Sequence, residues 1–132
     1  MFLNILDKNE RKNFLELATI AIKTDGDMNA SESAVFETYR MEMGIQEYIL
    51  QNKDYDQLLT SFNVSSKKVK RAIMIELAGV LDADEEVNEI EQKWIKKIGA
   101  DLGFSETEIR KMVRWAEDFN DLLKEGYIYI NR

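Results

Sequence analysis

The sequence predicts an all-α fold: a single helical domain over residues 1–132, built as a bundle of about five to seven helices from two repeats related by a pseudo-two-fold axis. The 132 residues contain no proline, apolar residues recur at helical spacing, and four segments match the capping box that begins a helix. The pattern of residues 25–32 also returns at residues 84–91, 59 positions later. With 45% hydrophobic residues, a chain of this length can bury a core without disulfides.

The expected helices follow from their start and stop signals. The capping boxes pair Asp7 with Glu10, Asn29 with Glu32, Asn88 with Glu91 and Ser105 with Glu108. The predicted helices span about 8–24, 30–43, 65–82, 89–102 and 106–125, with weaker helical segments near 46–51 and 54–61. Gly44 and Gly103 follow two of these helices, at positions where a left-handed C-terminal cap is expected.

The two repeats are expected to pack together through their first helices. Repeat one covers about 8–51 and repeat two about 65–110, and the first helix of each is apolar nearly all round. Such helices belong in a core, so we expect them to form a central pair about the pseudo-two-fold axis. Glu76 interrupts the second of them and is expected at the edge of the core with access to water, because a lone buried charge is costly.

The chain ends in an apolar tail at residues 126–132, after the predicted C-terminal helix. Residues 127–130 read Tyr-Ile-Tyr-Ile and alternate as a strand does, but no partner strand is evident. We expect the tail to fold over the helices and cover apolar surface. The alternative is that it mediates self-association into a homo-oligomer or enters the groove of a partner.

The composition excludes several kinds of chemistry. Histidine and cysteine are both absent, which removes imidazole and thiol catalysis and thiolate zinc sites. Any bound metal must therefore be held by oxygen atoms, which favours Ca²⁺ or Mg²⁺. No acidic residue has an evident apolar pocket that would raise its pKa for acid–base catalysis, so we expect a protein that is not an enzyme.

Charge and hydropathy limit the choice of partners. The net charge of −7 opposes binding to nucleic acid, and the basic cluster Lys67, Lys68, Lys70 and Arg71 is expected to form a solvated helix face. The longest apolar stretch, residues 72–81, is interrupted by an acid and too short to span a membrane. The first residues lack the basic leader of a secretion signal, so a cytoplasmic location is expected.

The repeated acidic turns are the candidate metal site. Their oxygen-bearing side chains are Asp25, Asp27, Asn29 and Glu32 in the first copy and Asp84, Glu86, Asn88 and Glu91 in the second. An EF-hand is excluded, because position 6 of each turn is not glycine and the glutamate comes four residues early. The turns serve either as helix caps alone, or also as the site for a divalent cation or a basic protein partner that relieves their repulsion.

Residues in both copies resemble a known family. They are Phe14-Leu-Glu-Leu-Ala18, Ala21, Asp25-Gly26, Glu32, Tyr39, Glu42-Met-Gly44, Ala78, Asp84, Glu91 and Leu102-Gly103. This pattern resembles the TerB-like family of bacterial tellurite-resistance and stress-associated proteins. The resemblance implies a pseudo-two-fold helical domain with an acidic face, proposed in the family to bind metal and to act in membrane-linked stress complexes. The family acids would be Asp25, Glu32, Asp84 and Glu91, although Glu85 replaces the glycine of the first turn. Tellurite resistance itself does not follow.

Overall fold

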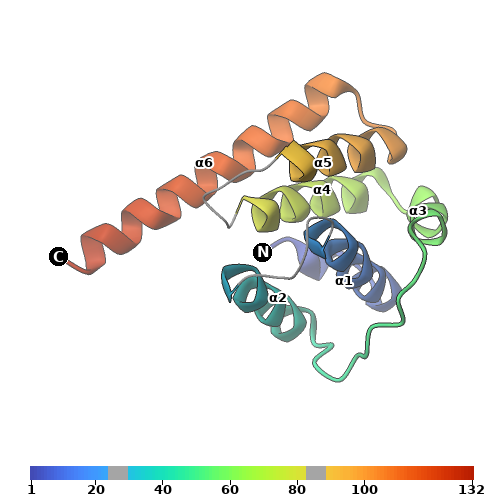
Figure 1. The fold of residues 1–132 in the computed structure, drawn as a ribbon, viewed down its shortest axis with the longest axis horizontal. Coiled ribbons are helices and arrows are strands. Elements are labelled where there is room, and N and C mark those ends of the chain that lie inside the picture. The colour runs from blue at the N-terminus through green and yellow to red at the C-terminus, as the bar shows by residue number, and fades with distance from the viewer. Residues whose placement is uncertain (24–29, 83–88) are drawn as a thin grey trace.

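The computed structural model describes residues 1–23, 30–82 and 89–132, and at positions 31 and 32 it describes the backbone alone. Within these ranges the fold is all-helical, as predicted, and contains no strand. A short 3₁₀ turn, η1 (Leu3–Ile5), precedes α1 (Lys8–Ile22), α2 (Ala30–Met43), α3 (Tyr55–Asn63), α4 (Lys67–Leu81), α5 (Glu89–Asp101) and α6 (Glu106–Ile130). Figure 1 shows that α1 to α5 form a compact body and that the end of α6 projects from it as an arm.

Helix α4 organises the body. It contacts η1, α1, α2, α5 and α6, and its most extensive partner is α6. Its residues Ile73, Met74 and Leu77 are fully buried, because the helix is apolar on almost every side. The predicted contact between the two apolar helices, α1 and α4, is present. However, α6 covers more of α4 than α1 does.

Helices of the first half of the chain recur at a fixed spacing in the second half. Helices α1 and α4 both have 15 residues and begin 59 positions apart, at residues 8 and 67. Both of the predicted glycine caps have left-handed backbones, with φ of 68° at Gly44 and 92° at Gly103. The residues that follow them, Ile45 and Phe104, each donate a 3.0 Å backbone bond to the carbonyl five residues earlier. The two-fold relation of the halves in space stays a prediction.

The helix starts are capped by side chains, as expected where they are described. The capping boxes of Asp7 with Glu10 and of Ser105 with Glu108 are both complete. Ser66 also accepts a bond from the backbone of the third helical residue of α4. This cap explains why α4 begins two residues later than predicted. The caps predicted at positions 29 and 88 lie outside the described residues.

The predicted helical segment at 46–51 is wrong, because this stretch is irregular. The backbone N–H groups of Gln51 and Lys53 donate to the buried carboxylate of Glu16, at 2.8 and 3.3 Å, instead of to helical carbonyls. The hydroxyl of Tyr48 donates to the same carboxylate at 2.6 Å. One glutamate of α1 therefore fixes the connection between α2 and α3.

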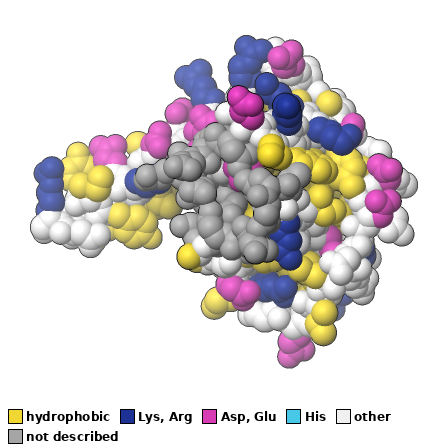
Figure 2. All heavy atoms as spheres, viewed as in Figure 1, with side chains coloured by type: hydrophobic (Ala, Val, Ile, Leu, Met, Phe, Trp, Pro, Cys, Tyr) yellow, Lys and Arg dark blue, Asp and Glu magenta, His cyan; other side chains and the backbone are white. Residues whose placement is uncertain are grey.

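The prediction that the tail folds over the helices is also wrong. Helix α6 continues to Ile130, and Tyr127, Ile128, Tyr129 and Ile130 are 58–77% exposed. Extending an existing helix adds one hydrogen bond for each residue fixed, whereas a strand here has no partner among the described residues. Figure 2 shows hydrophobic side chains on the surface of this arm.

Candidate binding groove

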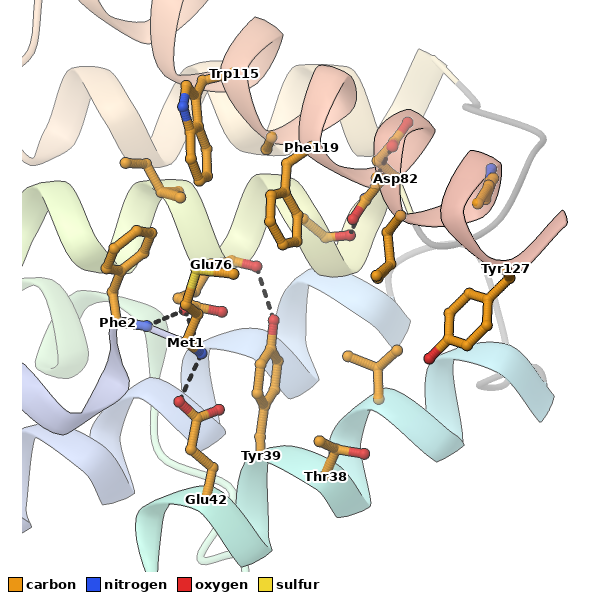
Figure 3. Close-up of a pocket in the computed structure, with 17 residues that line it drawn as sticks. Met1, Phe2, Thr38, Tyr39, Glu42, Glu76, Asp82, Trp115, Phe119 and Tyr127 are labelled. Atoms are coloured by element: carbon orange, nitrogen blue, oxygen red, sulfur yellow. Dashed lines mark hydrogen bonds and ion pairs between the residues drawn. The ribbon is translucent and has the colours of Figure 1, made fainter. Parts of the chain in front are cut away.

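An apolar groove of about 480 Å³ lies between α2, α4 and α6, and it is bounded on one side by the first two residues. Its apolar lining includes Phe2, Val35, Ile75, Trp115, Phe119, Leu123 and Tyr127. Its polar lining includes Thr38, Tyr39, Glu42, Glu76, Asp82, Asn120 and Lys124. Figure 3 shows the aromatic side chains of α6 directed toward α2 and α4. We call the surface formed by these residues the groove.

One wall of the groove is a row of α6 side chains. Trp115, Phe119, Leu123 and Tyr127 are spaced four residues apart, so they lie along one side of the helix. The rings of Trp115 and Phe119 stack, with centroids 5.5 Å apart and planes at 13°. The ring of Phe2 lies 5.8 Å from that of Trp115 and joins this wall to the N-terminal segment. Trp115 remains 44% exposed, so the wall is accessible from solvent.

The floor of the groove is held by a buried carboxylate. Glu76 of α4 is 7% exposed, which corrects the prediction that it has access to water. Its carboxylate accepts the backbone N–H of Phe2 at 2.7 Å and lies 3.0 Å from the amine of Met1, which also lies 2.6 Å from Glu42. Burial alone lowers the pKa of this amine, but the two carboxylates outweigh burial and raise it above its usual value.

Tyr39 joins the floor to the α2 side of the groove. Its hydroxyl donates to the backbone carbonyl of Glu76 at 3.0 Å, and its ring packs edge-on against Phe14 at 5.4 Å. Burial, reinforced by the charge of Glu76, raises the pKa of Tyr39 well above its usual value. The tyrosine is therefore a neutral structural donor at neutral pH.

Asn120 marks the point where α6 leaves the body. Its side-chain amide donates to the carbonyl of Gly79 at 3.2 Å and to the carboxylate of Asp82 at 3.0 Å. These bonds satisfy polar groups at the C-terminal end of α4, which would otherwise lack helical partners. Beyond Asn120, the side chains of Leu122 and Leu123 are 66% and 48% exposed.

The structure describes only part of the predicted metal site. Asp25, Asp27, Asn29, Asp84, Glu86 and Asn88 lie outside the described residues, as does the side chain of Glu32. Glu91 is described: it lies in the first turn of α5 and is 4% exposed. Within residues 1–23, 30–82 and 89–132, no three acidic side chains are grouped closely enough to hold a metal ion.

Glu91 nevertheless lies beside other acids. It lines a small pocket of about 40 Å³ together with Asp82 at the end of α4 and Glu117 of α6. The pKa of Glu117 is raised by burial and by the nearby charges of Asp82, Asp118 and Asp121. Negative charge therefore accumulates where α4, α5 and α6 meet.

The groove is suited to binding apolar groups. Its best-defined polar groups are engaged in structural bonds, Glu76 with the N-terminal segment and Asn120 with α4, so the surface offered to a ligand is mainly aromatic and aliphatic. Among the described residues, no helix combines the length and apolarity required to cross a bilayer. Over the described residues, the fold and groove together define an all-helical chain with an exposed apolar groove. No known family model, curated protein or solved structure matches this chain.

Sequence reasoning concentrated on the acidic turns and did not identify the groove. Of its aromatic residues, Tyr39 is buried, whereas Trp115 is partly exposed in the groove wall. The feature of the sequence that could have indicated the groove is the length of the apolar stripe of α6. It continues from Ile109 to Ile130, further than the body of a domain this small can cover.

Proposed function

We propose that this chain is a non-enzymatic binding module that receives an amphipathic helix in the groove. The observation that carries this proposal is the continuation of the apolar stripe of α6 beyond Asn120, where its side chains leave the body. The row from Phe119 to Tyr127 faces α2 across the groove, and Tyr127 is 58% exposed. An apolar helical face with a polar reverse side is the element that fits between two helices in this way.

The size of the accessible wall supports a helical occupant. The stretch from Trp115 to Ile130 covers 16 residues of α6, roughly 24 Å of helix axis. An occupant lying along this wall would contact it through residues spaced three and four apart, as in other helix-in-groove complexes. An extended peptide would gain less, because the described residues offer no sheet edge for it to pair with.

Fluorescence of Trp115 tests this function. The background variant Trp94→Phe leaves Trp115 as the single reporter, and it retains a ring beside Tyr55. The probe is a synthetic amphipathic helix of leucine and lysine, titrated at low protein concentration, and its control is a scrambled peptide of identical composition. We expect a saturable blue shift with the helix alone, because burial of the indole removes it from water.

Two further variants locate the binding. Phe119→Glu places a charge in the groove wall and should abolish the shift, whereas Val64→Glu alters an 89% exposed apolar residue outside the groove and should preserve it. Equal shifts with the helical and scrambled peptides, or equal binding by the two variants, would refute the proposal.

A second candidate rests on the acidic junction and on the resemblance to TerB-like proteins. In this proposal the chain is a stress-associated, duplicated TerB-like module that binds Ca²⁺, Mg²⁺ or a basic partner through its turns. The negative charge around Glu117 supports the basic-partner form of this proposal, because a positive charge bound there would relieve the repulsion. The recurrence of helix bounds 59 positions apart supports the duplication.

Metal-dependent stability tests the second candidate. A cation that binds only the folded chain at a hundredfold excess over Kd raises stability by about 2.7 kcal/mol. The double variant Asp25→Asn, Asp84→Asn should remove the increase in melting temperature that millimolar Ca²⁺ or Mg²⁺ causes. A melting temperature that neither ion moves would exclude the cation.

A further inference from the structure

We propose that the helix received by the groove is the α6 arm of a second copy of this chain, so that two arms pair antiparallel about a two-fold axis. This inference rests on the proposed function and names its partner. The arm is the part of α6 beyond Asn120, residues 121–130, and the end of α6 projects from the body (Figure 1). In an antiparallel pair that overlaps only along the arms, the two bodies lie at opposite ends of the pair.

The apolar stripe of α6 has the period of a helix that pairs with another helix. Ile109, Met112 and Ala116, spaced three and four apart, pack into the body, and Ala116 is 3% exposed. The same alternation of three and four continues through Phe119, Leu123, Gly126 and Ile130. A sustained repeat of this kind is typical of helices that associate through one seam. The first half of the seam is buried within the chain, and the second half extends beyond it.

The arm is complementary in shape to itself when it is antiparallel. A two-fold axis between residues 124 and 125 places Leu123 opposite Gly126 and Phe119 opposite Ile130 of the other copy. Gly126 has no side chain, which leaves a recess between its neighbours along the seam, and a Cβ added there would meet no other atom of the chain within 4 Å. The same axis places Leu122 opposite Tyr127. Because the axis is two-fold, each contact occurs twice.

Charge and area are consistent with a second copy as the occupant. The axis brings Arg132 close to Asp118 of the other copy, which is 64% exposed on the rim of the seam. On the pairing side of the arm, Leu123, Tyr127 and Ile130 are 48%, 58% and 77% exposed, and pairing would remove them from water. An interface limited to two short arms is small, and it predicts a weak dimer with a dissociation constant on the order of micromolar.

Sedimentation equilibrium over a range of concentrations tests the pairing in the full chain. We expect a reversible monomer–dimer equilibrium that Leu123→Glu weakens by roughly 30-fold or more. The matched control is Ile128→Glu on the same arm. Ile128 is 60% exposed but lies on the side of α6 opposite the seam, so its substitution should leave the equilibrium unchanged. Circular dichroism of both variants checks that they remain folded.

Gly126→Leu provides an independent test that does not depend on an added charge. The recess is open in the monomer, and leucine favours helix more than glycine does, so helical content should be maintained. The leucine fills the recess that receives Leu123, so the dimer should weaken by roughly tenfold. Unchanged or tighter association of this variant would overturn the proposed register.

The outcomes separate this inference from the proposed function. A chain that stays monomeric at all accessible concentrations while its groove binds the leucine–lysine helix refutes the pairing and leaves the function standing. A dimer that Leu123→Glu does not weaken also refutes the pairing, because its interface then lies elsewhere. A monomer whose groove binds no helix refutes both.

Discussion

Replacement of Glu16 by alanine should destabilise the fold by about 3 kcal/mol. The Glu16 side chain is buried, at 3% exposure, and accepts hydrogen bonds from Tyr48, Gln51 and Lys53 at 2.6, 2.8 and 3.3 Å. Hydrogen bonds to a charged group contribute about 1.5–3 kcal/mol each, but these three donors lie in an exposed connection and can turn to water. We therefore expect a net loss of about 3 kcal/mol in the free energy of unfolding, which corresponds to roughly 10 °C in melting temperature for a chain of this size.

Urea unfolding at several pH values measures this effect. Burial alone would raise the pKa of Glu16, but the bonds from Gln51, Tyr48 and Lys53 outweigh it and hold the pKa below its usual value of 4.5. The stabilisation is therefore complete above pH 4.5 and is lost as the pH falls through the lowered pKa. The difference in unfolding free energy between wild type and Glu16→Ala should narrow in acid.

The control for this experiment is an exposed glutamate. Glu37 is 73% exposed and lies 3.7 Å from Arg40, so Glu37→Ala should change stability by less than about 0.5 kcal/mol. A loss at Glu16 no larger than that at Glu37, or a difference that persists undiminished below pH 3, would refute the role assigned to this carboxylate.

Two smaller perturbations test the packing around α4 to α6. Gly99→Ala should destabilise the fold by about 1–3 kcal/mol in thermal unfolding, because the new Cβ would lie 2.6 Å from two side-chain atoms of the buried Ile109. An unchanged melting temperature would mean that the Ile109 side chain can move aside at no cost. Tyr39→Phe should cost about 1 kcal/mol in chemical unfolding, because it removes the 3.0 Å bond to the carbonyl of Glu76. If the stability of Tyr39→Phe is unchanged, the carbonyl of Glu76 must accept a hydrogen bond from another donor in the variant.

Most helices were predictable because their signals are local. Capping boxes at Asp7 and Ser105 and glycine caps at Gly44 and Gly103 fix helix ends through bonds between residues close in sequence. The segment at 46–51 was not predictable in this way. Its conformation depends on Glu16, more than 30 residues earlier, and the sequence around the segment does not reveal that partner.

The candidate site was less predictable than the fold. The tail was interpreted from the alternation of tyrosine and isoleucine, which favours a strand, but the helix preceding it needed only to continue. The groove arises where α2, α4 and α6 meet, so no single motif encodes it. Glu76 was expected near water because its partner, the N-terminal amine, is 75 positions away in sequence.

Asp82 links the two surfaces for which we propose functions. Its carboxylate lines both the groove and the small pocket beside Glu91, and it accepts the bond from Asn120 that holds the base of the arm. If both proposed functions hold, a ligand that draws this carboxylate toward the acidic junction would loosen the arm, and an occupant that stiffens the arm would alter the junction. By thermodynamic reciprocity, each binding event would then change the affinity for the other by the same factor. The shared side chain of Asp82 thus predicts coupling between the two surfaces.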